Sequence, residues 1–208
     1  MHAGSRTVDE DTAGRSSARE RLIDAGLALF GTVGYEATTI QMLCQHARVS
    51  TRDFYRHVGD RLGLFRILFE RELEQLQSPL MAAFDSVPPV WSVRARLWVE
   101  HWVQRMLEDP RRFRVMYTEA IGVSSDLDRR RHLVFQASVE IGITQMAICA
   151  EARGEHHPPR HYEVVAFALL GGAREVMARH MNDGLSTADI AAIVDDMVRI
   201  GVVLGERW

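Results

Sequence analysis

Apolar positions recur every three or four residues along most of the chain, the spacing of one face of an α-helix. The first such stripe covers residues 17–33. Ser16-Ser17 precedes it and Glu20 follows three residues later, a pattern that predicts a capping box at the helix N-terminus. Gly34 is expected to end this helix. No alternating β-type pattern of any length occurs, so the hydrophobic pattern predicts an all-α protein.

Two short helices and a long one are expected next. Thr38-Thr39 is a capping signal before a short apolar stripe, and Arg48-Val49 is the predicted tight break after it. Ser50 is predicted to cap a third helix, with Asp53 completing the cap. Gly59-Asp60 is expected to open a long fourth helix, in which Ser78-Pro79 is a candidate interruption.

The chain beyond Pro89 is also predicted to be helical. The expected helices are one of about 18 residues ending near Asp109 and others over about 110–122, 126–152, 161–181 and 187–205. Residues 1–16 lack periodicity and are expected to form a flexible arm. The predicted domains are therefore residues 17–64, a three-helix helix-turn-helix unit, and residues 65–208, a helical bundle.

Composition agrees with a folded protein of the cytoplasm. Of the 208 residues, 47% are hydrophobic and 25% charged, enough for a sizeable core without general disorder. No apolar run approaches the roughly 20 residues of a membrane helix, and the N-terminus lacks the apolar stretch of a signal peptide. Cys44 and Cys149 are too few and too isolated for a disulfide framework. We therefore expect a cytoplasmic protein with no membrane partner.

Two short helices joined by a tight turn and held against a longer helix can set one helix into the major groove of DNA. Residues 15–66 carry eight arginines against five acidic residues, a modest basic excess that fits a DNA-binding head. The predicted DNA contacts are the exposed polar residues of this region: Thr39, Thr51, Arg52, Tyr55, Arg56, His57 and Arg61. The alternative is that these are ordinary bundle helices with solvated arginines.

Different roles are expected within this set. Arg52, near the N-terminus of the third helix, can reach base edges, where a guanidinium pairs with guanine through two hydrogen bonds. Tyr55, His57 and the hydroxyl of Thr39 suit phosphate contacts, which position the protein without reading sequence. Arg61 is expected to present its charge to a phosphate at the N-terminus of the fourth helix.

The N-terminal third of the chain resembles the TetR family of bacterial regulators. The residues that carry the resemblance are Arg19-Glu20-Arg21-Leu22-Ile23-Asp24-Ala25, Leu29-Phe30, Gly34-Tyr35-Glu36-Ala37-Thr38-Thr39-Ile40, Val49-Ser50-Thr51-Arg52-Asp53-Phe54-Tyr55-Arg56-His57 and Leu64-Phe65. The resemblance implies an all-α homodimer whose first three helices bind a roughly palindromic double-stranded DNA operator. The larger C-terminal part would bind a small-molecule effector and carry the dimer contact, and most such proteins are repressors released by a ligand.

The sequence departs from the family pattern at several positions. Arg48 stands where glycine is common, and a left-handed arginine there would cost about 1 kcal/mol. Val58 replaces a usual phenylalanine and Leu62 a usual glutamate, while Arg61 replaces a usual lysine and keeps its charge. Asp53 is an acid facing a polyanion, and we assign it to capping rather than to base contact.

The last two predicted helices are more apolar than lone surface helices need to be. Two such helices from each of two chains could form a four-helix interface, and the family resemblance favours this interpretation over burial within one chain. The predicted dimer contacts are Leu169, Leu170, Ala173, Met177, Ile193, Met197 and Ile200.

Aromatic and methionine side chains recur on the helices between the head and this pair. Such residues line adaptable apolar pockets, although they also fill cores, and both interpretations stay open for each of them. The predicted effector contacts are Trp98, Trp102, Met106, Phe113, Met116, Tyr117, Phe135 and Met146. The effector would then be mostly apolar, and no cofactor is expected.

Competing functions receive less support from the sequence. A helical-bundle enzyme with a di-iron site would need Glu-x-x-His pairs, and none occurs; no phosphate loop or nucleophile elbow occurs either. Residues 155–161 contain three histidines, but adjacent histidines beside two prolines suit an exposed loop better than a metal site. A repressor that acts without a ligand is the closer alternative, which a filled body would favour and a cavity would oppose. The prediction is a ligand-released repressor, not an enzyme.

Overall fold

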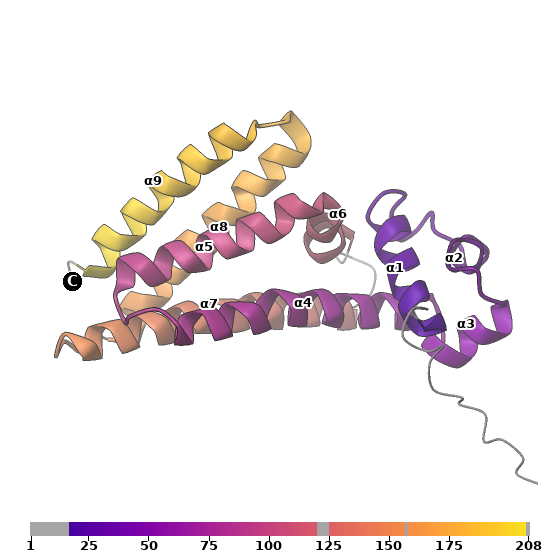
Figure 1. The fold of residues 1–208 in the computed structure, drawn as a ribbon, viewed down its shortest axis with the longest axis horizontal. Coiled ribbons are helices and arrows are strands. Elements are labelled where there is room, and N and C mark those ends of the chain that lie inside the picture. Colours follow the sequence, from indigo (N-terminus) through magenta and orange to yellow (C-terminus); the bar gives the residue numbers. More distant parts are fainter. Residues whose placement is uncertain (1–16, 120–124, 157, 207–208) are drawn as a thin grey trace, which may run out of the picture.

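The computed structural model describes residues 17–119, 125–156 and 158–206, and every regular element among them is a helix (Figure 1). The all-α prediction is confirmed. The arm predicted at residues 1–16 lies outside the described residues. A small head of three helices occupies one end of an elongated molecule, and the remaining helices form the body (Figure 1).

The head consists of α1 (Ala18–Phe30), α2 (Ile40–Ala47) and α3 (Thr51–Val58). Each begins at a predicted cap, because the side chains of Ser17, Thr39 and Ser50 accept hydrogen bonds from the backbone three residues on. Ser17 and Glu20 form the predicted capping box.

The first helix ends earlier than predicted. It stops at Phe30, and the N–H groups of Val33 and Gly34 both donate to the carbonyl of Leu29. Gly34 has a φ of 96°, a conformation that favours glycine, but it lies in the loop after the helix and not at its end. The periodic pattern overestimated the helix because Val33 is exposed and not part of the buried stripe.

Apolar side chains from all three head helices and from the start of the next helix share one core. Its fully buried members include Leu22, Phe30, Leu43, Phe54, Leu64 and Phe65. Phe30, Tyr35 and Phe65 form an aromatic triangle with ring centroids 5.3–5.4 Å apart. This core fixes the orientation of α3 relative to the rest of the head.

The fourth helix, α4 (Arg61–Asp85), leads from the head into the body (Figure 1). The interruption considered at Ser78-Pro79 does not occur, since Pro79 lies inside the helix. Pro79 and Gln75, whose carbonyl loses its intrahelical partner, are both exposed, so water can satisfy that carbonyl. The predicted domain boundary at residues 64 and 65 falls within α4, and the two parts share this helix.

The body is a bundle built around α5. Its elements are α5 (Trp91–Glu108), α6 (Pro110–Phe113), η1 (Arg114–Glu119), α7 (Ser125–Ala152), α8 (Pro159–Asp183) and α9 (Thr187–Glu206). Helix α5 packs against α4, α7, α8 and α9, and α8 lies between α7 and α9. The helices predicted from sequence are therefore present, but η1 is a π-helix, which the sequence pattern did not predict.

One helix is apolar enough to cross a membrane by length and composition. The segment Asp128–Ala152 has a mean hydropathy of 1.4 over its most apolar window, and 39% of that window is buried in the fold. Gln136, Glu140 and Gln145 interrupt this segment, so the expectation that no unbroken apolar run of membrane length occurs is unchanged. A helix that packs within a bundle can pass the same test, because its apolar residues face neighbouring helices.

Candidate DNA-binding interface

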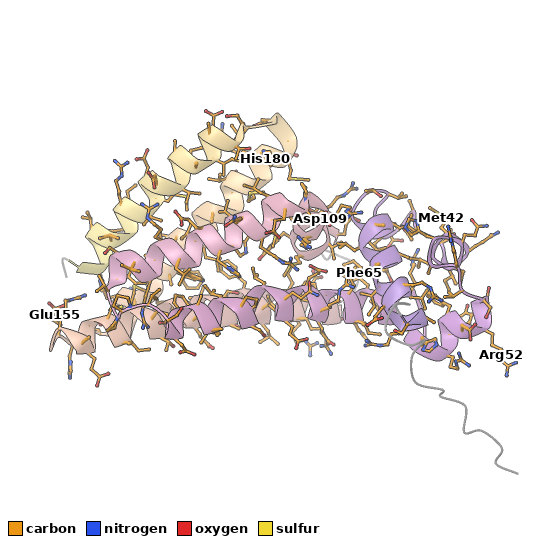
Figure 2. The ribbon with its side chains drawn as sticks, viewed as in Figure 1. Met42, Arg52, Phe65, Asp109, Glu155 and His180 are labelled. Atoms are coloured by element: carbon orange, nitrogen blue, oxygen red, sulfur yellow. The ribbon has the colours of Figure 1, made fainter. Side chains whose placement is uncertain are left out.

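The exposed face of α3 lies at the end of the head farthest from the body. Thr51, Arg52, Tyr55 and Arg56 are exposed, while Phe54 beneath them is fully buried. Figure 2 shows Arg52 pointing outward at this end. The Arg52 guanidinium has no hydrogen bond or ion pair with any described residue. The structure therefore presents a free arginine where sequence analysis placed the base-reading residue.

Asp53 organises the first turn of α3. The Ser50 hydroxyl accepts a hydrogen bond from the Asp53 N–H at 3.0 Å and donates to its carboxylate at 2.7 Å. The Ser50 hydroxyl, aided by the charge of Arg56, holds the pKa of the Asp53 carboxyl below its ordinary value. The same carboxylate pairs with Arg56 at 2.7 Å, and Arg56 also lies 3.3 Å from the His57 ring. Asp53 is thus a capping group, as expected. Its ion pair also uses part of the hydrogen-bonding capacity of the Arg56 guanidinium.

The turn between α2 and α3 is built on Arg48. Its φ and ψ are 53° and 49°, the left-handed conformation considered from sequence. Its N–H donates to Gln45 and the Val49 N–H donates to Cys44, so the carbonyls at the end of α2 are satisfied. Arg21 of α1 also donates from Nε to the Ala47 carbonyl at 3.0 Å. These bonds outweigh a strain of about 1 kcal/mol.

Arg61, a predicted phosphate contact, donates hydrogen bonds to the loop before α2. Its Nη1 donates to the carbonyls of Glu36 and Thr38 at 3.2 and 2.9 Å. Its guanidinium carbon lies 4.3 Å from the centre of the Tyr35 ring. In addition, the carboxylate of Asp60 caps α4 by accepting from Gly63 at 2.6 Å. The negative charge of Asp60 therefore lies at the N-terminus of α4, where the positive end of the helix dipole was expected to attract a phosphate.

The loop between α1 and α2 is joined to the body at η1. Glu119 accepts a hydrogen bond from the Tyr35 N–H at 2.8 Å. Arg114 donates from Nε to Glu119 at 2.9 Å and from Nη1 to the Thr32 carbonyl at 2.6 Å. An added Cβ at Gly34 would lie 3.1 Å from the Glu119 carboxylate, so the glycine allows this close approach. The head and the body are therefore linked by two side chains of a π-helix, an element that often marks functional sites.

A second link runs through the buried carboxylate of Glu72 on α4. Its side chain is 1% exposed and lies 3.1 Å from Arg71, 3.5 Å from Arg105 and 3.1 Å from Arg112. Arg71 also pairs with Asp24 of α1 at 2.7 Å. The ion pairs thus connect the head with α4, α5 and α6.

Sequence analysis missed both Glu72 and Glu119. A signal for Glu72 was available, because it stands four residues after Leu68 and four before Leu76, at an inward position of an apolar stripe. A charge at such a position indicates a buried partner. Glu119 carries no comparable signal, since its partner in the head, Tyr35, lies 84 residues away along the chain.

The family model for the bacterial regulatory proteins of the tetR family matches residues 22–67. This stretch contains most of α1, all of α2 and α3 and the start of α4, the elements that form the head and its exposed face. The match assigns the head to the TetR family of DNA-binding domains. The protein is accordingly a DNA-binding transcriptional regulator, as predicted from its N-terminal residues.

Solved structures of similar fold include other regulators. FadR from Bacillus subtilis, in complex with stearoyl-CoA, has a TM-score of 0.76 and 14% identity, covering 88% of this chain and 97% of its own. FadR from Bacillus halodurans has a TM-score of 0.77 and 14% identity, covering 90% and 96%. A tetR-family protein from Rhodococcus RHA1 has a TM-score of 0.71 and 18% identity, covering 91% and 97%. At these identities the likeness shows the fold. No curated protein matches the sequence.

In this TetR-family protein most of the predicted effector residues are buried in the body. Trp98, Trp102, Met106, Phe113, Met116 and Met146 are each at most 5% exposed, while Tyr117 and Phe135 are partly buried. Trp102, Phe113 and Tyr117 form one aromatic cluster with centroids 5.2–6.3 Å apart. The structure therefore brings three of the eight residues into ring contact.

The remaining predicted effector residues do not join this cluster through ring contacts. Phe135 packs against Phe167 at 5.7 Å, between α7 and α8. Trp98 and Trp102 line a cavity with Leu170 and neighbouring residues, but its volume is only about 10 Å³. A space of that size holds about one water molecule, so this part of the body is packed around the two tryptophans in this conformation.

Tyr117 is the polar member of the aromatic cluster. Its hydroxyl oxygen accepts a hydrogen bond from Trp102 Nε1 at 3.0 Å. Burial raises the pKa of this hydroxyl to about 12, so it is protonated at neutral pH. No described residue accepts its hydrogen. The hydroxyl therefore keeps one donor available inside an otherwise apolar region.

The structure places most of the predicted dimer contacts in the interior of a single chain. Leu169, Leu170, Ala173 and Met177 are at most 5% exposed within a single chain, and Ile193 and Met197 are partly buried. Only Ile200, 59% exposed, lies open to a partner. Within the chain α8 lies between α7 and α9, and these two helices cover much of its apolar stripe. A contact of this stripe with a partner chain stays a prediction.

Other predicted features have simple placements. Both cysteines are buried, and neither forms a disulfide. Among the described residues no group of three His, Cys, Asp or Glu could hold a metal ion, and His157 of the histidine-rich loop lies outside them. His156 is exposed there and contacts the Glu155 carbonyl.

Proposed function

We propose that this TetR-family protein is a repressor that a small, mostly apolar ligand releases from its operator. The DNA-binding part of this proposal rests on Arg52, which has no partner among the described residues and lies on the exposed face of α3. The buried Phe54 on the other face of α3 fixes this helix to the core of the head. A rigid helix with an unpaired guanidinium is suited to reading guanine in the major groove. The proposed supporting contacts are Thr39, Thr51, Tyr55, Arg56 and His57.

Arg61 enters this proposal with a changed role. Its guanidinium holds the carbonyls of Glu36 and Thr38, which precede the cap of α2. It therefore positions the start of α2 against α4, and any phosphate contact would use its remaining donors. Replacing Arg61 would therefore remove a positive charge and also disturb the packing of the head.

Ligand control is supported by the way in which the head is attached. The Tyr35 N–H and the Thr32 carbonyl are both held by η1, so a ligand that displaces η1 changes the support of the loop before α2. The FadR protein of similar fold from Bacillus subtilis was crystallised with stearoyl-CoA. An acyl-CoA is therefore the first ligand to test, and its chain would enter the region of Trp102, Phe113 and Tyr117 as the helices separate.

The packed interior supports a second candidate, a repressor that acts without a ligand. The cavity beside Trp98 and Trp102 is far too small for an acyl chain. Ligand control requires a minor, more open conformation of the body that the ligand selects. A ligand-independent repressor requires none.

We further propose a homodimer formed by α8 and α9 through residues other than those first expected. The exposed apolar side chains of this pair are Val164, Phe167, Met181, Ile200 and Val203. An apolar groove of about 140 Å³, lined by Ala168, Ile200 and Leu204 among others, lies between the two helices and could receive a partner side chain. A twofold dimer would bind a roughly palindromic operator. We place this regulator in the cytoplasm and assign it no enzymatic activity.

The test is a selection of genomic fragments by the purified protein, followed by titration of the recovered operator. We expect an inverted repeat and nanomolar-range binding, of about 10⁻⁸ M or tighter at physiological salt. Stearoyl-CoA should weaken this binding at least about tenfold, whereas coenzyme A alone should not. Unchanged binding with all acyl chain lengths favours the ligand-independent repressor. Failure to enrich any sequence contradicts both candidates.

A further inference from the structure

A cleft opens on the body beside the contact with the head. Its described lining comes from two elements: Phe113, Arg114 and Thr118 from the α6–η1 segment, and Ala178, Met181 and Asn182 from the C-terminal part of α8. Its volume is about 440 Å³, within the range of small-molecule sites. This cleft is much larger than the interior cavity beside the tryptophans.

The charge of the cleft is positive. Arg114 is the one charged side chain among its described lining residues. Its Nε and Nη1 hold Glu119 and Thr32, and its Nη2 has no hydrogen bond with a described residue. The side chains of Thr118 and Asn182 are exposed and likewise bond to no described residue. A cation flanked by available polar groups favours an anionic ligand.

The lining of the cleft also contains apolar side chains. Met181 is 39% exposed, and Phe113 belongs both to the lining and to the aromatic cluster, with ring centroids 6.3 Å from Trp102 and 5.2 Å from Tyr117. An apolar group placed against Phe113 would thus lie next to the region assigned to the effector. The ring of Tyr117, whose hydroxyl keeps an available hydrogen, packs against Phe113.

We infer that this cleft binds an amphipathic anion, an apolar chain or ring that ends in a carboxylate or phosphate, through Arg114. The inference rests on the proposed function in treating this anion as the effector. Its anionic group competes with the Glu119 carboxylate and the Thr32 carbonyl for the Arg114 guanidinium. Binding therefore loosens the attachment of the loop before α2, which gives the ligand a direct route to the DNA-binding head.

The experiment is isothermal titration of the full chain, without DNA, with three probes of equal chain length below their micelle concentrations. Decanoate and decyl phosphate are expected to bind, with 1-decanol at least about tenfold weaker because it lacks the charge. The tighter of the two anions identifies the end group, and either order supports the inference. Equal binding of 1-decanol, or no binding of either anion, would overturn it.

Variants locate the site. Arg114→Gln is expected to weaken anion binding at least about tenfold. Arg111→Gln should leave it within about twofold, since Arg111 pairs with Asp109 at 2.8 Å and does not line the cleft. Because Arg114 also supports the head, a second pair of variants leaves the contacts of Arg114 unchanged. Asn182→Asp should weaken anion binding through charge repulsion, and the neutral Asn182→Gln should not. Unchanged affinity in both Arg114→Gln and Asn182→Asp contradicts the site. Since no DNA is present, this outcome is independent of whether the protein is a repressor.

Discussion

The backbone N–H of Tyr35 donates to the carboxylate of Glu119 at 2.8 Å, across 84 positions of the chain. Tyr35 is buried in the head, where its ring packs against Phe30, Phe65 and the guanidinium of Arg61. Glu119 ends the π-helix of the body and is held by Arg114. One hydrogen bond therefore joins the core of the DNA-binding head to the element that borders the proposed effector cleft.

Replacing Glu119 tests this link. Glu119→Ala leaves the partly buried Tyr35 N–H without its acceptor, which is expected to cost about 1–3 kcal/mol of unfolding free energy in urea titrations. Glu140→Ala, at an exposed position of α7, is the control and should change stability by less than about 0.5 kcal/mol. Equal stability of the two variants would show that the bond contributes nothing to the attachment of the head.

Arg52 should carry base discrimination. Arg52→Ala is expected to reduce the preference for the operator over a sequence changed at the contacted base by about 1–3 kcal/mol. Arg199→Ala on α9, far from the head, is the control in the same fluorescence-anisotropy titrations. Arg61→Ala should instead weaken binding to all sequences and lower the salt slope by about one unit if it reaches a phosphate. Retained discrimination in Arg52→Ala would remove Arg52 from the role of base reader.

Glu72 and Glu70 form a natural comparison on α4. Glu72→Gln leaves Arg71, Arg105 and Arg112 around a neutral group and is expected to destabilise the protein by about 3–5 kcal/mol. Glu70→Gln breaks an exposed pair with Arg130 and should cost less than about 1 kcal/mol. Urea unfolding followed by circular dichroism measures both. A small effect of Glu72→Gln would mean that the three arginines do not depend on its charge.

Acid should weaken the cap of α3 through Asp53. Because its pKa in the folded protein is lower than the ordinary value of 3.8, its stabilising contribution is complete above that value and is lost as the pH falls through the lowered pKa. The thermal midpoint of Asp53→Asn should therefore fall less steeply than that of the parent protein between about pH 5 and about pH 3. Asp85→Asn, at the exposed end of α4, is the control and should keep the parent slope.

The same Asp53→Asn change also bears on DNA binding. It removes a negative charge from the recognition face and releases Arg56 from its 2.7 Å pair. Non-specific DNA binding should become tighter, with a steeper dependence on salt. Weaker non-specific binding would indicate that the cap matters more to DNA docking than the released charge.

The α8–α9 surface should set the oligomeric state. Phe167→Glu and Ile200→Asp place charges on the exposed apolar face of this pair and are expected to give monomers by light scattering. Ile148→Glu is the control, since it changes a comparably exposed apolar residue on α7. A dimer that survives both α8 and α9 substitutions would place the interface elsewhere.

The local features of the head could be predicted from the sequence. Caps at Ser17, Thr39 and Ser50, the capping role of Asp53 and the outward position of Arg52 depend on residues three or four positions apart, and helical periodicity fixes such relations. The family resemblance rests on the same local pattern, and it identified the chain as a TetR-family regulator.

The partners of side chains that make contacts far along the chain were decided only by the tertiary structure. Arg61 donates to carbonyls in the loop before α2. Glu72 forms ion pairs with arginines from three elements, and Leu169 is buried by helices of its own chain. A stripe of apolar residues shows that a helix face will be buried, but it does not name the neighbour that buries it. That choice depends on the packing of helices far apart in sequence. For the same reason the outward position of Arg52, the proposed base reader, was predictable from the sequence, whereas the Glu119 link and its adjacent cleft were not.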